Sequence, residues 1–401
     1  MSARLIFALS AGGSLLLLLS ACATPDRTAR PIPRTEPAAV ASISAQAKNL
    51  RAQQPPRPGV DAMPRERPSS GPPTALLVSP LQLPPGLDVT AWCRDLANAG
   101  VTAIVIEAWT RADHGKGGDP VQRRAGLYFQ SGLGPVAQDL LASLAAAARA
   151  QGLALYASVG LRRIDWLDPN LGWTLPVYDP NRRAFQRSDH LDLFHPVYQD
   201  FLGGLLRDLV ATGIDGIVIR ADGTIGPTTG ISTFGLKGFE RDFGSRPDLK
   251  EIVEGNGGEG KRPPVYWQWV GWVTREQQHV LDRLVNGLAR ERPGLKVILE
   301  VHPETVLTPL QGLVRHGEDL LEAVRGRYAA YLVSEIGRGK ESLLSRLKEI
   351  VGGPDRAWVL LPLPWGTVVQ TGQPSVSAVR ERDARLGESG VLYAVGSPSL
   401  P

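Results

Sequence analysis

Cysteine is scarce in this chain: Cys22 and Cys93 are the only two among 401 residues. We expect Cys22 to carry a lipid, because it ends a signal-like segment, and Cys93 then has no disulfide partner even in an oxidising compartment. Thiolates alone therefore cannot build a zinc site. The run Trp92–Leu96 predicts a helix that holds the Cys93 thiol on or near its packed face, as a small hydrophobic side chain.

Signals for metals, cofactors and nucleic acids are also missing. No strand-to-helix turn is Gly-rich in the dinucleotide or P-loop manner, so we expect no cofactor. The six histidines show no metal-ligand spacing, so we expect no metal. His302, near Glu300, is predicted to face a cleft, and His279 and His316 are predicted to lie on helix surfaces. The formal charge is +4, and removal of Arg4 with the signal lowers it by one, to +3. This balance is too small to indicate a nucleic-acid partner.

A hydrophobic run long enough to span a bilayer is absent. Segment 1–21 has one early positive charge, Arg4, and an apolar region, Leu5–Leu19, that is too short for a transmembrane helix. It ends in Leu19-Ser20-Ala21-Cys22, which resembles the bacterial lipobox and implies cleavage before Cys22 and lipidation of its thiol. Because Ala23 stands where inner-membrane retention would need Asp, we expect an outer-membrane lipoprotein that faces the periplasm. The alternative is an ordinary signal peptide that happens to contain a cysteine.

Residues 22–73 are rich in Pro, Ala, Arg, Ser and Gln, and they have no sustained apolar period. Such a composition buries too little surface to offset the entropy lost on ordering, so we predict a disordered tether. The predicted organisation is therefore a signal peptide at 1–21, the lipid-bearing Cys22 with its tether at 22–73, and one folded domain at 74–401.

Short apolar runs alternate with helix-patterned segments through residues 74–401, which indicates a β/α architecture. Eight strands with helices between them predict a (β/α)8 barrel of TIM type, and an open doubly wound sheet is the alternative. The predicted strands are Ala75–Ser79, Ala103–Ala108, Ala154–Val159, Gly216–Arg220, Val297–Val301, Ala330–Ser334, Trp358–Pro362 and Val391–Val395. The predicted helices are Val89–Ala99, Val136–Gln151, Val197–Thr212, Arg275–Arg292, Pro309–Arg325, Glu341–Val351 and Val376–Leu386.

Four of these strands end on or next to a carboxylate: Glu107, Asp222, Glu300 and Glu335. The clearest case is Asp222, which follows an apolar run that stops at Arg220. Active sites of barrel enzymes lie at the carboxyl ends of the strands, so these acids favour a glycoside hydrolase. One carboxyl group would protonate the glycosidic oxygen, and another would act as base or nucleophile. The alternative is that the acids form structural ion pairs with a neighbour such as Arg220.

Aromatic residues are frequent in segments that we predict to be loops, where rings can stack on sugars. Trp109, Trp267, Trp269 and Trp365 are predicted to bind substrate. Glu107 is predicted to contact sugar hydroxyls or the ammonium groups of glucosamine. For each ring the alternative is ordinary packing in the core.

The order and spacing of several segments resemble the C-terminal glycoside-hydrolase domain of the PgaB-type deacetylases of poly-β-1,6-N-acetylglucosamine. The segments are Gly100–Trp109 with Gly126–Phe129, Leu191–Pro196 with Ile214–Ile217, and Trp269 with Leu295–Val297. The resemblance runs from about Thr74 to the end. It implies a (β/α)8 barrel that cleaves the partially deacetylated polymer, and it raises the export machinery of that polymer as a candidate partner. The family's deacetylase domain has no counterpart here, since the tether occupies its place, so deacetylation is not expected.

The resemblance also suggests roles for the acids. The family's His-Asp-Asp-Ala-like run corresponds to Arg220-Ala221-Asp222-Gly223, which has one acid instead of two, and Val273 stands near the place of a family lysine. We expect Asp222 to be the general acid, with Glu300 and Glu335 as candidates for the second carboxylate. The missing acid motivates a second hypothesis, a non-catalytic glycan-binding lipoprotein that aids exopolysaccharide export or retention. A purely structural role in the envelope is the third.

Overall fold

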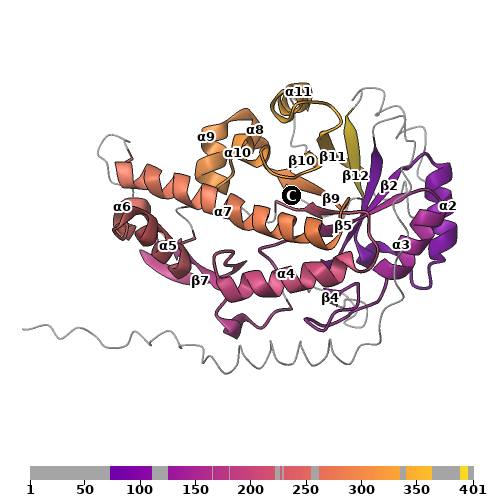
Figure 1. Ribbon diagram of the computed structural model, residues 1–401, viewed down its shortest axis with the longest axis horizontal. Coiled ribbons are helices and arrows are strands. Elements are labelled where there is room, and N and C mark those ends of the chain that lie inside the picture. Colours follow the sequence, from indigo (N-terminus) through magenta and orange to yellow (C-terminus); the bar gives the residue numbers. More distant parts are fainter. Residues whose placement is uncertain are drawn as a thin grey trace, which may run out of the picture. The chain divides into compact units, whose positions relative to one another are not determined.

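Eight parallel strands close into a barrel (Figure 1). The computed structural model describes residues 73–110, 125–164, 166–179, 181–221, 226–227, 230–253, 262–334, 340–363 and 389–395. Every predicted strand is confirmed to within one residue at each end. Because β12 pairs with β1, the sheet is a closed (β/α)8 barrel and the open sheet is excluded. In order around the barrel, the strands are β1 (Thr74–Val78), β2 (Ala103–Glu107), β5 (Ala154–Val159), β8 (Gly216–Ile219), β9 (Lys296–Val301), β10 (Ala330–Ser334), β11 (Ala357–Leu363) and β12 (Gly390–Val395).

From β1 to β11, helices connect successive strands and cover the outside of the barrel (Figure 1). The longer ones are α2 (Val89–Asn98), α3 (Leu141–Ala150), α4 (Pro196–Val210), α5 (Thr233–Phe243), α7 (Pro264–Glu291) and α11 (Lys340–Val351). The shorter ones are η1 (Pro80–Gln82), η2 (Pro169–Leu171), α6 (Leu249–Val253), α8 (Pro303–Leu307), α9 (Pro309–Gln311) and α10 (Leu320–Ala323), with one π-helical turn, η4 (Gly312–His316). The predictions for α2, α4 and α11 are confirmed to within two residues. The predicted helix Val376–Leu386 lies outside the described residues.

Two predicted helices have wrong boundaries for local reasons. The helix predicted from Val136 starts at Leu141 instead, because the backbone before it pairs with Leu127: the Leu127 N–H donates to the Pro135 carbonyl, and the Ala137 N–H to the Leu127 carbonyl. The single helix predicted over Pro309–Arg325 is divided into α9, η4 and α10. Gly317 ends η4 in the left-handed conformation, with φ 61°, and this backbone angle stops a right-handed helix.

The helix predicted at Arg275–Arg292 begins earlier, at Pro264, so Trp267, Trp269 and Trp272 lie in α7 and not in a loop. The buried residues of this N-terminal part follow helical spacing, as in Tyr266, Trp269, Val270 and Val273. Trp269, Trp272 and Val273 pack against α5 and α6 in a small core of their own, separate from the barrel. The aromatic residues of this segment therefore serve mainly as packing.

Short strands that we did not predict occupy the connections at the carboxyl end of the barrel. β3 (Trp109–Thr110) pairs with β4 (Gly126–Leu127), and β6 (Thr174–Asp179) forms a hairpin with β7 (Ala184–Leu191). The hairpin lies in the β5-to-α4 connection. A bridge between Val177 and Gly230 joins the hairpin to the β8-to-α7 connection, so two long insertions support each other on the functional face of the barrel.

Large and small residues fill the inside of the barrel together. Tyr156 and Trp358 meet edge to face across the interior, with ring centroids 6.1 Å apart. Glycine is required beside each ring, since a Cβ atom on Gly216 or Gly390 would lie 2.6 Å from the Tyr156 or Trp358 ring, respectively. The interior is therefore a packed core and not a pore.

A larger core lies between the strands and the surrounding helices. Cys93 belongs to it and is fully buried on α2, as predicted. Burial raises the pKa of the Cys93 thiol to about 11, which keeps the thiol protonated and unreactive at neutral pH.

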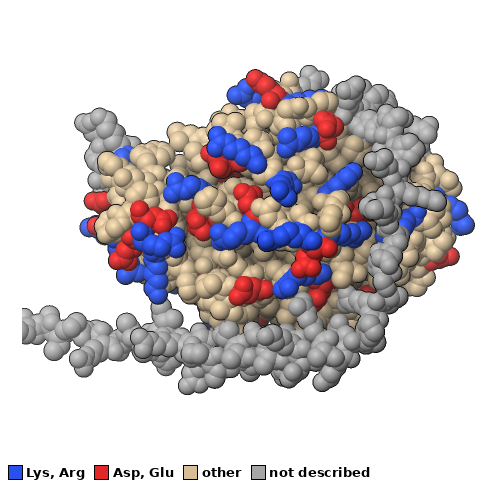
Figure 2. Space-filling model, viewed as in Figure 1, with Lys and Arg blue, Asp and Glu red and all other residues tan. Residues whose placement is uncertain are grey.

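The surface carries both signs of charge. Figure 2 shows a row of Lys and Arg side chains across the viewed face, with Asp and Glu side chains on both sides of the row. None of the helices that the structure describes is both long and apolar enough to cross a membrane.

Candidate functional site

Polar side chains line the carboxyl-terminal mouth of the barrel. Strand residues point alternately inward and outward. The interior core includes Val105, Val218, Ile298 and Leu332. Two residues further along the same strands stand Glu107, Arg220, Glu300 and Ser334. The alternation places these four side chains inside the mouth, at the end where barrel enzymes hold their substrates.

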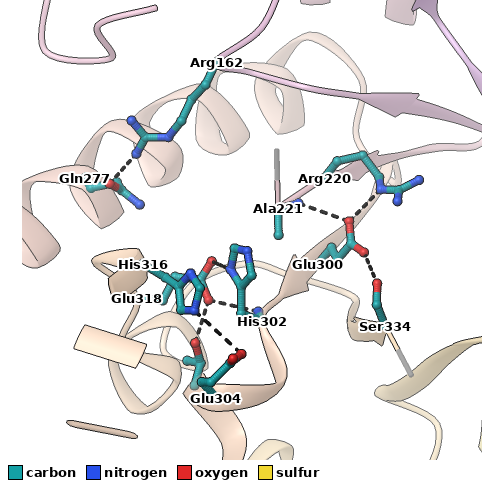
Figure 3. A network of polar contacts seen from close by, with 11 residues as sticks. Arg162, Arg220, Ala221, Gln277, Glu300, His302, Glu304, His316, Glu318 and Ser334 are labelled. Carbon is teal, nitrogen blue, oxygen red and sulfur yellow. Dashed lines mark hydrogen bonds and ion pairs between the residues drawn. The ribbon is translucent and has the colours of Figure 1, made fainter. Parts of the chain in front are cut away.

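Glu300 is the centre of this group. Its carboxylate accepts three hydrogen bonds, from Arg220 Nε at 2.5 Å, from the Ala221 backbone N–H at 3.1 Å and from Ser334 Oγ at 2.6 Å. Figure 3 shows Arg220 and Ser334 approaching the carboxylate from different sides. The Glu300 side chain is 5% exposed and that of Arg220 27%. All three partners are donors, and they engage both oxygens of the carboxylate.

The other predicted site residues differ in how far their side chains are exposed. Glu107 is partly exposed at the end of β2, beside Ser158 of β5. Trp109 is buried in β3, and Trp269 is 1% exposed, with its ring N–H donating to the Pro227 carbonyl at 2.7 Å. Rings buried to this degree present no face to a sugar, so the structure corrects their predicted role to packing. Trp267 is 42% exposed, on the first turn of α7.

Several predicted site residues lie outside the described part of the chain. They are the proposed general acid Asp222, the candidate second acid Glu335, the predicted sugar-binding Trp365 and the lipidation site Cys22. Asp222 follows Ala221, whose backbone N–H is bound by Glu300, so Glu300 fixes the chain one residue before the predicted acid.

A second polar cluster, which we did not predict, lies beside the first. Glu318 accepts hydrogen bonds from His302 Nδ1 at 2.8 Å, from the His302 backbone N–H at 3.0 Å and from Thr305 Oγ1 at 2.6 Å. Burial opposes ionisation of Glu318, but the His302 and Thr305 contacts outweigh burial and lower its pKa. Burial likewise opposes protonation of His302, and the Glu318 carboxylate outweighs it, raising the His302 pKa. Each group therefore favours the charged form of the other, and the two form a buried ion pair when His302 is protonated.

His316 stacks on His302, with ring centroids 3.7 Å apart and an interplanar angle of 10°. The prediction of a surface position for His316 is wrong, since the residue is buried, whereas His279 is exposed as predicted. Burial first, and the charge on His302 second, lower the pKa of His316. Neither ring nitrogen has a hydrogen-bond partner among the described residues, and the Glu304 carboxylate is 3.6 Å from Nε2. A buried polar group without partners costs about 1–3 kcal/mol.

A cavity of about 60 Å³ separates the two clusters. Its lining comes from the carboxyl ends of β5, β8 and β9, from α7 and from the β9-to-α10 connection, so it opens on the same functional face of the barrel. Its apolar lining residues include Leu161, Leu193, Leu281 and Leu320. Its polar lining residues include Arg162, Gln277, Gln278, His316 and Glu318. In Figure 3, the Arg162–Gln277 contact lies across from the histidine cluster.

Among the described residues, no group of three or more His, Cys, Asp or Glu side chains is arranged to hold a metal ion. The chemistry that the described site offers is therefore that of carboxylates, a guanidinium group, hydroxyls and imidazoles.

No protein-family model and no curated protein sequence matches this chain. Its fold is similar to the glycoside hydrolase domain of PgaB (BpsB) from Bordetella bronchiseptica, with a TM-score of 0.57, 17% identity, and coverage of 80% of this chain and 93% of that one. It is also similar to two β-galactosidases. For that of Bacillus circulans sp. alkalophilus, the TM-score is 0.53 and the identity 11%, over 82% of this chain and 51% of that one. For that of the psychrophilic Marinomonas ef1, the TM-score is 0.52 and the identity 9%, over 80% of this chain and 53% of that one. The chain spans about half the length of these β-galactosidases. At these identities the likeness shows the fold, and it confirms the predicted resemblance to the PgaB hydrolase domain at that level: the chain is a closed (β/α)8 barrel.

Proposed function

We propose that this protein is an envelope lipoprotein whose barrel hydrolyses an amino-sugar exopolysaccharide, with partially deacetylated poly-β-1,6-N-acetylglucosamine as the substrate class. The observation that carries the proposal is the set of charged and hydroxyl side chains inside the carboxyl-terminal mouth, centred on Glu300. Support for the substrate comes from the sequence resemblance to PgaB-type proteins and from the shared fold with the PgaB (BpsB) hydrolase domain. The lipid on Cys22 and the tether would hold the barrel at the outer membrane, facing the periplasm.

In the proposed mechanism Asp222 is the general acid. It gives its proton to the glycosidic oxygen as the bond to the anomeric carbon breaks, and water supplies the hydroxyl that ends on that carbon. Glu335 is our choice for the second carboxylate, because the carboxylate of Glu300 is already bound by three donors. Glu300 acts as a positioning residue that holds Arg220 and the Ala221 backbone. Glu107 contacts sugar hydroxyls or ammonium groups at the edge of the mouth.

A second candidate function is favoured by the same ion pair. Arg220 stands where the family's catalytic run begins, and its bond to Glu300 withdraws one carboxylate from proton transfer. A barrel of this kind would bind glycan without cutting it, as an aid to exopolysaccharide export or retention, with the export machinery as a partner.

The deciding experiment incubates the protein with partially deacetylated poly-β-1,6-N-acetylglucosamine and measures new reducing ends. Asp222→Asn is the test variant, and Asp355→Asn, outside the proposed site, is the matched control. Hydrolysis predicts new reducing ends that are lost with Asp222→Asn and kept with Asp355→Asn. Retention on a polymer column without cleavage would favour the binding function. An Asp222→Asn protein with full activity would remove Asp222 from the mechanism.

Trp267 allows a separate test of polymer contact. It precedes Val280, the first α7 residue in the barrel's outer core, by 13 positions, which is about 20 Å along a helix. A sugar stacked on Trp267 would thus lie several sugar units along the polymer from a sugar held at the mouth. We expect Trp267→Ala to weaken retention of long polymer and to leave short oligomers unaffected. Leu81→Ala, at a similarly exposed apolar residue in η1, is the control. Equal effects of Trp267→Ala on long and short ligands would argue against a distant contact.

A further inference from the structure

We propose that the cavity between the Glu300 and His316 clusters is a subsite for the acetamido group of an N-acetylated sugar. The inference rests on the proposed function and adds to it a binding pocket outside the barrel interior. The lining places this pocket between β8, β9, α7 and the β9-to-α10 connection, next to the mouth.

The size of the cavity limits what can enter it. At about 60 Å³ it takes a few water molecules or one substituent of a sugar ring, and it is too small for the whole ring. A ring lying over the mouth would place a single substituent in the pocket.

The lining of the cavity suits a substituent with one apolar end and one polar end. Leu161, Leu193, Leu281 and Leu320 offer an apolar surface to a methyl group. His316 offers two ring nitrogens without hydrogen-bond partners among the described residues, whereas Gln277 accepts from Arg162 and the Gln278 amide donates to Asp282 and Tyr328. An acetamido group has a methyl, a carbonyl acceptor and an N–H donor, and so it matches the leucines and His316.

The charges around the cavity disfavour an ammonium group. Glu300 is paired with Arg220, and Glu318 with His302. The Asp319 carboxylate accepts from the backbone N–H groups of Leu321 and Glu322 at the start of α10. A free ammonium entering the pocket would find these carboxylates already engaged and would meet the Arg162 guanidinium group in the lining, and burying a charge in that way is costly.

His316 is the group that points most directly to a ligand. It is 7% exposed, it lines the cavity, and both of its ring nitrogens lack hydrogen-bond partners among the described residues. Its environment keeps the ring neutral near pH 7, so one nitrogen donates and the other accepts. An amide can satisfy either nitrogen. The pocket thus has an unmet hydrogen-bonding requirement that an acetamido group meets.

The test compares binding of two probes, fully N-acetylated and fully deacetylated β-1,6-linked glucosamine pentamers, by isothermal titration calorimetry at pH 7.5. Two variants alter the pocket: His316→Leu removes the ring nitrogens, and Ala323→Leu fills the cavity from α10. His279→Leu, at an exposed histidine of α7, is the matched control, and thermal melts check folding of all three. We expect both pocket variants to weaken binding of the acetylated pentamer about tenfold while the deacetylated pentamer is unaffected. The control should change neither affinity.

The outcomes distinguish a failure of the subsite from a failure of the proposed function. If the wild type binds both pentamers and the pocket variants change the two affinities equally or not at all, the subsite is overturned and the proposed function stands. If the wild type binds neither pentamer, the proposed substrate class fails and the subsite fails with it. A second measurement is independent of polymer length: N-acetylglucosamine should shift the imidazole NMR signals of His316 and not those of His279. Glucosamine should leave both residues unchanged, and an equal shift by the two sugars would contradict the assignment.

Discussion

Glu300 and Glu318 are two buried carboxylates with the same set of partners in different parts of the fold. Each accepts hydrogen bonds from one basic side chain, one backbone N–H and one hydroxyl group. The basic partner of Glu300 is Arg220, and that of Glu318 is His302. Glu300 joins β9 to β8 and β10 at the mouth of the barrel. Glu318 lies in the β9-to-β10 connection, 16 residues after His302, and its hydrogen bonds hold the two ends of this segment together.

The difference between the two basic partners determines what each cluster can do. Arginine stays protonated at any physiological pH, so the Arg220–Glu300 pair is a permanent part of the mouth. Histidine loses its charge near neutral pH, so the His302–Glu318 pair depends on pH. The first pair therefore fixes the strand ends, and the second is sensitive to conditions in the compartment around the protein.

The largest effect should come from breaking the permanent pair. Arg220→Met leaves the Glu300 carboxylate buried without its cation, and we expect the free energy of unfolding to fall by about 3 kcal/mol in urea denaturation. Arg346→Met, in the exposed Arg346–Glu349 pair, should cost less than about 0.5 kcal/mol. The double variant Arg220→Met/Glu300→Leu should recover much of the loss, because no unpaired charge remains. A loss from Arg220→Met as small as that from Arg346→Met would show that the pair does not stabilise the mouth.

Breaking the pH-dependent pair should cost less and should depend on pH. Glu318→Gln removes a charged acceptor of three hydrogen bonds, and we expect a loss of about 2 kcal/mol near pH 6. The His302 pKa is raised from 6.5 in the folded state, so its stabilisation is full below pH 6.5 and is lost as the pH rises through the folded value. The Glu318 pKa is lowered from 4.5, so its stabilisation is full above pH 4.5 and is lost as the pH falls through the folded value.

Denaturation of the wild type and Glu318→Gln from pH 4 to 9 checks this window. The difference between them should be greatest between pH 4.5 and 6.5 and should shrink on the alkaline side. The effect of Arg220→Met should not shrink between pH 6.5 and 9, since the arginine keeps its charge there. If both differences follow the same pH profile, the distinction between the two clusters is wrong.

The sequence predicts the barrel well because its strands are buried on both faces and read as apolar runs. It predicts Glu300 at the mouth for the same reason, since an acid at the end of such a run points into the barrel. The prediction that Trp267 and Trp269 lie in a loop is wrong, since both belong to the N-terminal part of α7. The spacing of Tyr266, Trp269, Val270 and Val273 is the signal that would have indicated a helix.

The second cluster could not be predicted, because it depends on where one chain segment turns. A continuous helix over Pro309–Arg325 would give no reason to place Glu318 beside His302. The π turn η4 and the left-handed Gly317 bring it there. His316 is buried by the same turn, although its sequence neighbours Arg315 and Gly317 suggest a surface position. Side chains that meet through an irregular backbone leave no periodic pattern in the sequence.

The smallest effect that separates the two clusters concerns His316. Its pKa is lowered from 6.5 in the folded state by burial and by the charge on His302, so the unfolded chain binds its proton more readily. Stability is therefore lost as the pH falls below 6.5, and the loss is complete once the folded pKa is passed. Glu318, and Glu304 at 3.6 Å from Nε2, offset only part of it, and Arg315 on the same turn adds to it. We expect His316→Leu to lose less stability than the wild type between pH 7 and 5, measured by urea denaturation, with a smaller difference than either pair gives. His279→Leu, at an exposed histidine, should follow the wild type over this range. If His316→Leu follows it as well, the stacked ring is not a charge-sensitive part of the fold, and the pH response of this region comes from His302 and Glu318 alone.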